Sequence, residues 1–136
     1  MPATALILVS AAVVGLAVGS FLATLVLRLP RHLPVVIGRS ACPQCGHALG
    51  AFELIPLASW LVQRRRCRAC GGTISAFYPA MEMVSALVAV AAFAALRWPM
   101  AVAACFGGWF ALTLAAWMAR KWLFGGGAAA GFRRRG

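Results

Sequence analysis

Three long apolar runs, separated by one polar segment and one short turn, dominate the chain. Residues 3–27 contain no charged side chain, and a second run covers residues 80–96 with Glu82 near its start. A third run covers residues 99–119 and ends at Arg120. A helix of about 20 residues, rising about 1.5 Å per residue, spans the hydrocarbon core of a bilayer. The pattern therefore predicts an α-helical membrane protein with three transmembrane helices.

The polar segment between the first two runs is expected to form a small domain of its own. Arg97-Trp98-Pro99 separates the last two runs, and a tight turn is favoured there because proline disfavours helix at the preceding residue. The Gly- and Ala-rich end of the chain cannot bury a core, so we expect disorder. The predicted parts are a first transmembrane helix (1–27), a loop domain (28–79), a transmembrane hairpin (80–119) and a basic tail (120–136).

Small residues recur at every fourth position on one face of the first predicted helix. They are Ala11, Gly15, Gly19 and Ala23. Small side chains at this spacing let two membrane helices approach closely. We therefore interpret this face as a helix-packing surface, whose partner is a helix either of this chain or of another protein.

Composition and charge add an orientation to this picture. The chain is 63% hydrophobic and only 11% charged, which excludes an ordinary soluble domain. The chain has thirteen Lys and Arg residues and only two acidic residues. Of the basic residues, the turn of the predicted hairpin carries only Arg97. The positive-inside rule then places the loop and the tail in the cytoplasm, with the N-terminus outside.

The basic residues of the loop are expected at the membrane surface. Between them, residues 52–62 are strongly apolar yet too short to span, so this segment should lie on the membrane surface or over the helix ends. This local hydrophobicity favours lipid over nucleic acid as the partner of the basic side chains. The candidates for lipid contact are Arg28, Arg31, Arg64, Arg65 and Arg66.

Four of the five cysteines form two matched CxxC turns, each followed by a glycine that permits the backbone to reverse. A CxxC turn places two thiolates on one edge, and two such turns complete the tetrahedron that zinc prefers. The spacing predicts a zinc-knuckle loop with a structural four-cysteine site and no open position for a catalytic water. Its expected ligands are Cys42, Cys45, Cys67 and Cys70.

Other uses of these residues fit the pattern less well. Disulfides require an oxidising compartment, whereas the charge bias places the loop in a reducing one. A redox CxxC would be expected inside a thioredoxin-like unit, which the sequence lacks. His47 remains an alternative zinc ligand, with a solvated loop histidine as the simpler interpretation. Cys105 lies within the third apolar run and is interpreted as a small buried hydrophobe.

Several of these segments together resemble the amino-terminal domain of the type IV prepilin peptidases. The resemblance covers roughly residues 15–90. It is carried by Gly19-Ser20-Phe21-Leu22 leading to Arg28-Leu29-Pro30, by the stretch from Ile55-Pro56 to Cys70, and by Tyr78-Pro79-Ala80-Met81-Glu82. It implies a bacterial cytoplasmic (inner) membrane protein acting on type IV pilin or type II secretion pseudopilin precursors. Such enzymes cleave the leader, and many then methylate the new amino terminus with S-adenosylmethionine.

The peptidase step of that family belongs to a carboxy-terminal domain with two aspartates, and this sequence contains no Asp. An aspartic peptidase needs two carboxylates that share a proton. Glu53, in the loop, and Glu82, at a helix start, do not offer such a pair, so peptidase activity of this chain alone is not expected. The sequence also has Ala23, Leu54 and Phe77 where the family usually has polar residues.

Three roles remain open. In the first, the chain would transfer methyl groups from S-adenosylmethionine to pilin amino termini, with Glu82 as the candidate base at the membrane boundary. Alternatively, it is a non-catalytic accessory or split-half subunit that docks a separate peptidase half, or it is an inactive remnant. A purely structural interpretation of Glu82 is equally open, since the dipole of a helix favours an acidic side chain near its N-terminus.

Overall fold

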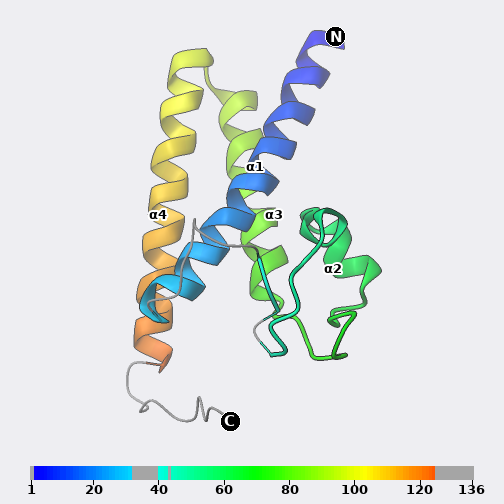
Figure 1. The fold of residues 1–136 in the computed structure, drawn as a ribbon. Coiled ribbons are helices and arrows are strands. Elements are labelled where there is room, and N and C mark those ends of the chain that lie inside the picture. Colours follow the sequence, from blue (N-terminus) through cyan, green and yellow to red (C-terminus); the bar gives the residue numbers. More distant parts are fainter. Residues whose placement is uncertain (1, 32–39, 43, 125–136) are drawn as a thin grey trace.

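The computed structural model of the chain contains three long helices (Figure 1). They are α1 (Pro2–Arg28), α3 (Phe77–Ala95) and α4 (Trp98–Phe124). Each is long and apolar enough to cross a membrane. The predicted architecture of three membrane-capable helices, with a four-cysteine loop between the first two, is therefore confirmed. The side of the membrane on which the loop lies stays a prediction.

The structure describes residues 2–31, 40–42 and 44–124. The disorder expected for the end of the tail concerns residues 125–136, which lie outside the described residues. The side chain of Arg31 also lies outside them. The helix α4 continues beyond the apolar run, through Arg120 and Lys121, as far as Phe124.

Short elements connect α1 to α3. They are η1 (Leu29–Arg31), η2 (Ala51–Leu54) and α2 (Ala58–Val62). In the described part of the loop, the β-type pairings are two isolated antiparallel bridges, Ala41 with Ala48 and Arg66 with Thr73. Figure 1 shows α2 beside the amino-terminal half of α3, so the loop folds back along the helices.

The small-residue face of α1 lies against α3 of the same chain. A Cβ atom added at Gly15 would lie 2.6 Å from the Cα of Ala86, and one at Gly19 would lie 2.6 Å from the Cα of Glu82. Real Cβ atoms essentially never approach this closely, so the two backbones touch where α1 has no side chains. On the same face, Ala23 is fully buried.

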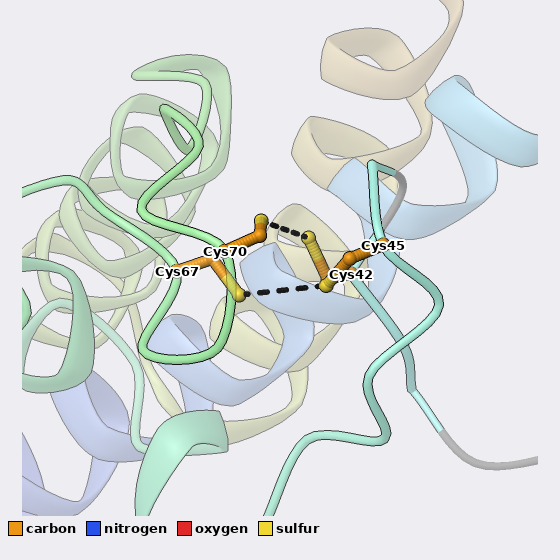
Figure 2. A group of neighbouring side chains, drawn as sticks. All are labelled: Cys42, Cys45, Cys67 and Cys70. Carbon is orange, nitrogen blue, oxygen red and sulfur yellow. Dashed lines mark hydrogen bonds between the residues drawn. The ribbon is translucent and has the colours of Figure 1, made fainter.

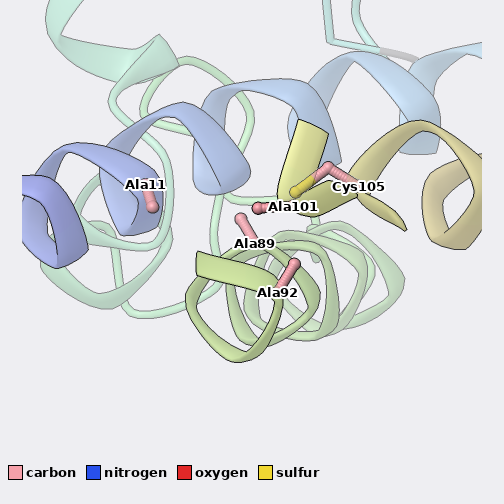
Figure 3. Packing of buried hydrophobic residues seen from close by; sticks show 5 residues of the cluster. All are labelled: Ala11, Ala89, Ala92, Ala101 and Cys105. Carbon is pink, nitrogen blue, oxygen red and sulfur yellow. The ribbon is translucent and has the colours of Figure 1, made fainter. Parts of the chain in front are cut away.

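The core between the helices is made of small side chains (Figure 3). Its buried cluster consists of Ala11, Ala89, Ala92, Ala101 and Cys105. In lipid, the close approach of backbones is what holds helices together, and small residues allow it. Cys105 lies in this cluster, far from the other cysteines in sequence, as expected for a small buried hydrophobe.

Polar contacts add to this packing where the helices cross. The indole Nε1 of Trp109 on α4 donates to the backbone oxygen of Ser85 on α3 at 3.2 Å. Arg120 on α4 donates to the backbone oxygen of Val26 on α1, also at 3.2 Å. As Figure 1 shows, α1 runs diagonally across α3, and its carboxyl end lies next to α4.

Candidate metal centre and the cavity beside it

The four loop cysteines converge on one point (Figure 2). Their Sγ atoms all lie within 4.8 Å of one another. The Cys42 and Cys70 sulfurs are 3.9 Å apart, and those of Cys45 and Cys67 are 4.0 Å apart. Sulfurs at the corners of a zinc tetrahedron, with Zn–S near 2.3 Å, would be about 3.8 Å apart. The four cysteines are therefore positioned to bind a metal ion, and their spacing fits zinc.

Both CxxC turns are built by the same hydrogen bonds. The N–H of Gly46 donates to the Cys42 carbonyl at 2.9 Å, and the N–H of Gly71 donates to the Cys67 carbonyl at 2.9 Å. Gly46 and Gly71 have φ of 74° and 69°. Only glycine adopts this left-handed region without steric cost. The glycine after each pair is thus required by the turn that brings the two sulfurs to one side.

Backbone groups also prepare one of the thiols for metal binding. Hydrogen bonds from the backbone of Cys70 and of Ala69 lower the pKa of the Cys67 thiol to about 7. A hydrogen bond from the backbone of His47 lowers the pKa of Cys45, but burial and the neighbouring thiols outweigh it and raise that pKa to about 11. Because a thiol binds metal as thiolate, metal binding must displace protons here.

The alternatives for the cysteines find no support among the described residues. None of the five cysteines is in a disulfide. The described group able to hold a metal contains only Cys42, Cys45, Cys67 and Cys70. His47 is exposed and is not part of it.

Glu82 has a hydrogen-bond partner in the loop that its sequence position did not indicate, and its role as a base stays a prediction. It is only 5% exposed, and its Oε2 accepts a hydrogen bond from the backbone N–H of Leu57 at 2.7 Å. Leu57 directly precedes α2 and has φ of 59°, a region that side-chain-bearing residues rarely adopt. Sequence reasoning missed Leu57, since nothing in its neighbourhood signals a left-handed turn.

The basic residues proposed to contact lipid divide into two groups. Arg64 and Arg65 are exposed and both have positive φ, with the Arg65 guanidinium 5.5 Å from the centre of the Trp60 ring. Arg66 is also exposed. Arg28, in contrast, is half-buried and faces a cavity. Contact with lipid stays a prediction for all of them.

Two apolar side chains of the segment between the two CxxC turns are exposed, whereas Trp60 is half-buried. Phe52 is 84% exposed and Val62 is 72% exposed. Their exposure fits a segment in contact with the membrane surface, which also stays a prediction.

A cavity of about 120 Å³ lies between α1, α3 and the loop. Its walls include Thr24 and Arg28 of α1, Tyr78 of α3, and two metal-site residues, Cys42 and Cys67. Both acidic residues of the chain also line it: Glu53 from the loop and Glu82 from α3. Sequence reasoning treated these two carboxylates as unrelated, because only the fold of the loop brings them to one cavity.

The fold and the cysteine site together define a three-helix membrane protein with a four-cysteine metal-binding loop between its first two long helices. The family model described as Bacterial Peptidase A24 N-terminal domain matches residues 13–96, which include both CxxC turns and Glu82. The chain belongs to this family.

Curated relatives carry the name prepilin leader peptidase/N-methyltransferase. One from Myxococcus xanthus is 46% identical over 86 residues, which cover 63% of this chain and 26% of the relative. One from Bacillus subtilis is 46% identical over 78 residues (57% of this chain, 32% of the relative). One from Burkholderia pseudomallei is 38% identical over 129 residues (76% of this chain, 42% of the relative). The matches thus span less than half of each of these relatives. No solved structure matches the chain significantly.

Proposed function

We propose that this chain is a membrane-embedded, zinc-binding domain that acts in the maturation of type IV pilins or pseudopilins, by amino-terminal methylation or by recognition of the prepilin. The observation that carries the proposal is the family match over residues 13–96. The curated relatives are named for two activities, leader peptidase and N-methyltransferase.

The peptidase activity is not assigned to residues 1–136. These residues contain no Asp, and Glu53 and Glu82 lie on separate elements, each with one oxygen engaged by a backbone N–H. A peptidase of this class needs a matched pair that activates water. The leader would therefore be cleaved by residues beyond these 136, in a separate peptidase half or elsewhere.

For the methyl-transferring role, the pilin amine would attack the methyl group of S-adenosylmethionine, forming an N–C bond as the S–C bond breaks and S-adenosylhomocysteine leaves. The amine must be neutral when it attacks, so a nearby base must take its proton. Glu82 is a buried carboxylate at the wall of the cavity, which supports its candidacy. The zinc ion would hold the loop in the shape that forms this wall, since Cys42 and Cys67 also line the cavity.

The basic loop supports a location in the bacterial inner membrane with the loop in the cytoplasm, where S-adenosylmethionine is available. The direct test uses the purified chain in nanodiscs, S-adenosylmethionine with a labelled methyl group, and a peptide with a mature pilin amino terminus. We expect label on the peptide amine, and less label with Glu82→Gln.

The second candidate role is that of a non-catalytic subunit that docks a separate peptidase half, and the lack of Asp favours it. A chain that transfers no label but co-purifies in detergent with a peptidase half would support this role. If the chain neither transfers label nor co-purifies with a peptidase half, the inactive remnant is the remaining interpretation.

A further inference from the structure

Three consecutive arginines, Arg64, Arg65 and Arg66, form an exposed turn directly after α2, here called the arginine turn. Between residues 44 and 76 the chain has four arginines and one carboxylate, that of Glu53. One oxygen of Glu53 accepts from the backbone N–H of Gly50 at 2.9 Å. Among the described residues, none of the three arginines forms an ion pair. Their positive charge is therefore left for an anionic partner outside the chain.

Two of these arginines have a backbone conformation that favours glycine. Arg64 has φ of 49° and Arg65 has φ of 65°. Backbone hydrogen bonds fix the turn: the N–H of Arg65 donates to the Trp60 carbonyl at 3.0 Å, and the N–H of Ile74 donates to the Arg65 carbonyl at 2.7 Å. Residues with side chains are unfavourable in the left-handed region and cluster at functional sites when they occur there. Arginine in place of glycine at both positions indicates that the charged side chains themselves are needed.

The side chain of Arg65 is also held in position by an aromatic ring. Its guanidinium lies 5.5 Å from the centre of the Trp60 ring. The indole Nε1 of Trp60 in turn donates to the backbone oxygen of Ile74 at 3.3 Å, which orients the ring. A guanidinium that is already ordered loses less conformational entropy when it binds an anion.

Exposed apolar side chains lie beside the arginine turn. Leu61 and Val62, in the last turn of α2, are 61% and 72% exposed. Phe52 is 84% exposed and borders the same groove, of about 200 Å³, as Val62 and Arg68. Basic and apolar side chains exposed together are typical of a segment that lies in the membrane interface, with arginines among the headgroups and apolar side chains among the acyl chains.

The position of α2 along α3 agrees with an interfacial location. The N–H of Leu57, directly before α2, donates to Glu82, the sixth residue of α3. At about 1.5 Å per residue, Glu82 lies about 8 Å from the start of α3. Because α3 is about as long as the hydrocarbon core is thick, this turn would lie near the interface. Figure 1 shows α2 beside this amino-terminal half of α3.

We propose that the arginine turn, together with Phe52, Leu61 and Val62, is a binding surface for anionic phospholipid. The lipid phosphate would bind the arginines, and its acyl chains would pack on the apolar side chains. A guanidinium binds phosphate through two parallel N–H···O hydrogen bonds. Nucleic acid also offers phosphates, but it has no apolar body to cover Phe52 and Val62. Arg68 lies between two metal ligands in the sequence, so the binding is assigned to the arginine turn.

The test measures lipid binding to the full-length, zinc-loaded chain in detergent by native mass spectrometry. Phosphatidylglycerol and phosphatidylcholine with the same acyl chains are compared, and we expect the anionic lipid to bind about tenfold more tightly. Arg64→Gln/Arg65→Gln should remove most of this preference, whereas Arg64→Lys/Arg65→Lys should keep it. Arg97→Gln/Lys121→Gln is the matched control, since it removes the same charge from exposed positions at the two ends of α4, and it should leave the preference unchanged.

A glycine variant separates lipid binding from folding. Arg64→Gly/Arg65→Gly relieves the left-handed backbone, so we expect it to keep its zinc and its resistance to unfolding while it loses the lipid preference. A merely structural role of the arginines would not give this combination. Phe52→Ser/Val62→Ser should weaken the binding of both lipids and keep their ratio, and unchanged affinities would contradict the apolar part of the surface.

Equal binding of the two lipids by the unaltered chain overturns the proposal, as does a preference that the Gln variant retains and the control loses. Displacement of phosphatidylglycerol by millimolar inorganic phosphate would show a site for free anions instead. Binding of a single-stranded oligonucleotide in preference to phosphatidylglycerol would show a nucleic-acid surface, and either result overturns the lipid assignment. The assay uses no pilin and no S-adenosylmethionine, so its outcome is independent of the proposed function.

Discussion

The carboxylate of Glu82 on α3 accepts a hydrogen bond from the backbone N–H of Leu57 in the loop, at 2.7 Å. Leu57 is in the left-handed region of backbone conformation and directly precedes α2. One side chain of a membrane helix thus fixes a turn of the loop that would otherwise be unfavourable. This contact joins the loop to α3.

Replacing Glu82 should loosen this turn. Glu82→Leu removes the acceptor and leaves the N–H of the half-buried Leu57 unpaired, a loss of about 1 kcal/mol. We expect amide hydrogen exchange at Leu57 and in α2 to accelerate at least tenfold, with Glu82→Gln showing a smaller effect because it keeps an acceptor. Identical exchange in all three proteins would show that the bond does not hold the loop.

The four loop cysteines, and not Cys105, should determine metal content. Cys42→Ser and Cys67→Ser each remove one thiolate from the tetrahedron, so we expect the purified proteins to lose their zinc. Cys105→Ser, in the core between the helices, is the matched control and should keep a full equivalent. Elemental analysis by mass spectrometry gives the answer, and equal zinc in all three variants would refute the site.

Removing the metal should open the loop without unfolding the helices. We expect a strong zinc chelator to make the protein in detergent sensitive to trypsin at the exposed Arg64, Arg65 and Arg66, because the two CxxC turns would then no longer be joined. The membrane helices, which pack without the metal, should stay protected. Gel analysis of the fragments distinguishes this result from general unfolding, in which the helices would be cleaved or aggregate as well.

The close contact of α1 with α3 should make Gly19 intolerant of any side chain. Gly19→Ala places a Cβ against the Cα of Glu82, so the helices must move apart, and we expect a loss of about 1–3 kcal/mol in stability. Gly107→Ala on α4 is the control, since a Cβ there meets nothing within 4 Å. Unfolding in detergent mixtures measures both variants, and equal stability would contradict the tight packing.

Orientation can be tested with fusions to alkaline phosphatase, which is active only outside the cytoplasm. With the loop in the cytoplasm, a fusion after Arg97 should be active and one after Lys121 inactive, because the two residues lie at opposite ends of α4. The reverse pattern would place the loop outside and remove the argument from the positive-inside rule.

The features that sequence analysis predicted are those with a local signal. Apolar length is enough to locate three spans, and the spacing of the CxxC pairs is enough to select four sulfurs that the structure brings within 4.8 Å. The small-residue face of α1 was also visible, although its partner was not. Its periodicity describes one helix alone and does not show that Ala86 and Glu82 lie opposite.

The cavity could not be predicted, because it depends on how the loop folds back beside α3. Glu53 and Glu82 lie in different elements, and no motif links them. No glycine marks the left-handed turn at Leu57 in the sequence. The acceptor that compensates for this turn is Glu82, 25 residues further along the chain. Contacts of this kind follow from the tertiary arrangement and leave no pattern in the neighbouring sequence.

The helices α1 and α3 differ in length, so the thickness of the bilayer can affect the cavity between them. With 27 and 19 residues they measure about 40 Å and about 28 Å, and tilting is one way for the longer α1 to fit a membrane of the thickness that suits α3. Ser20, Thr24 and Arg28 lie on the carboxyl-terminal half of α1 and form one wall of the cavity. If α1 tilts, lipids with longer or shorter acyl chains should change the tilt, and thereby the width of the cavity, without the alteration of a single residue.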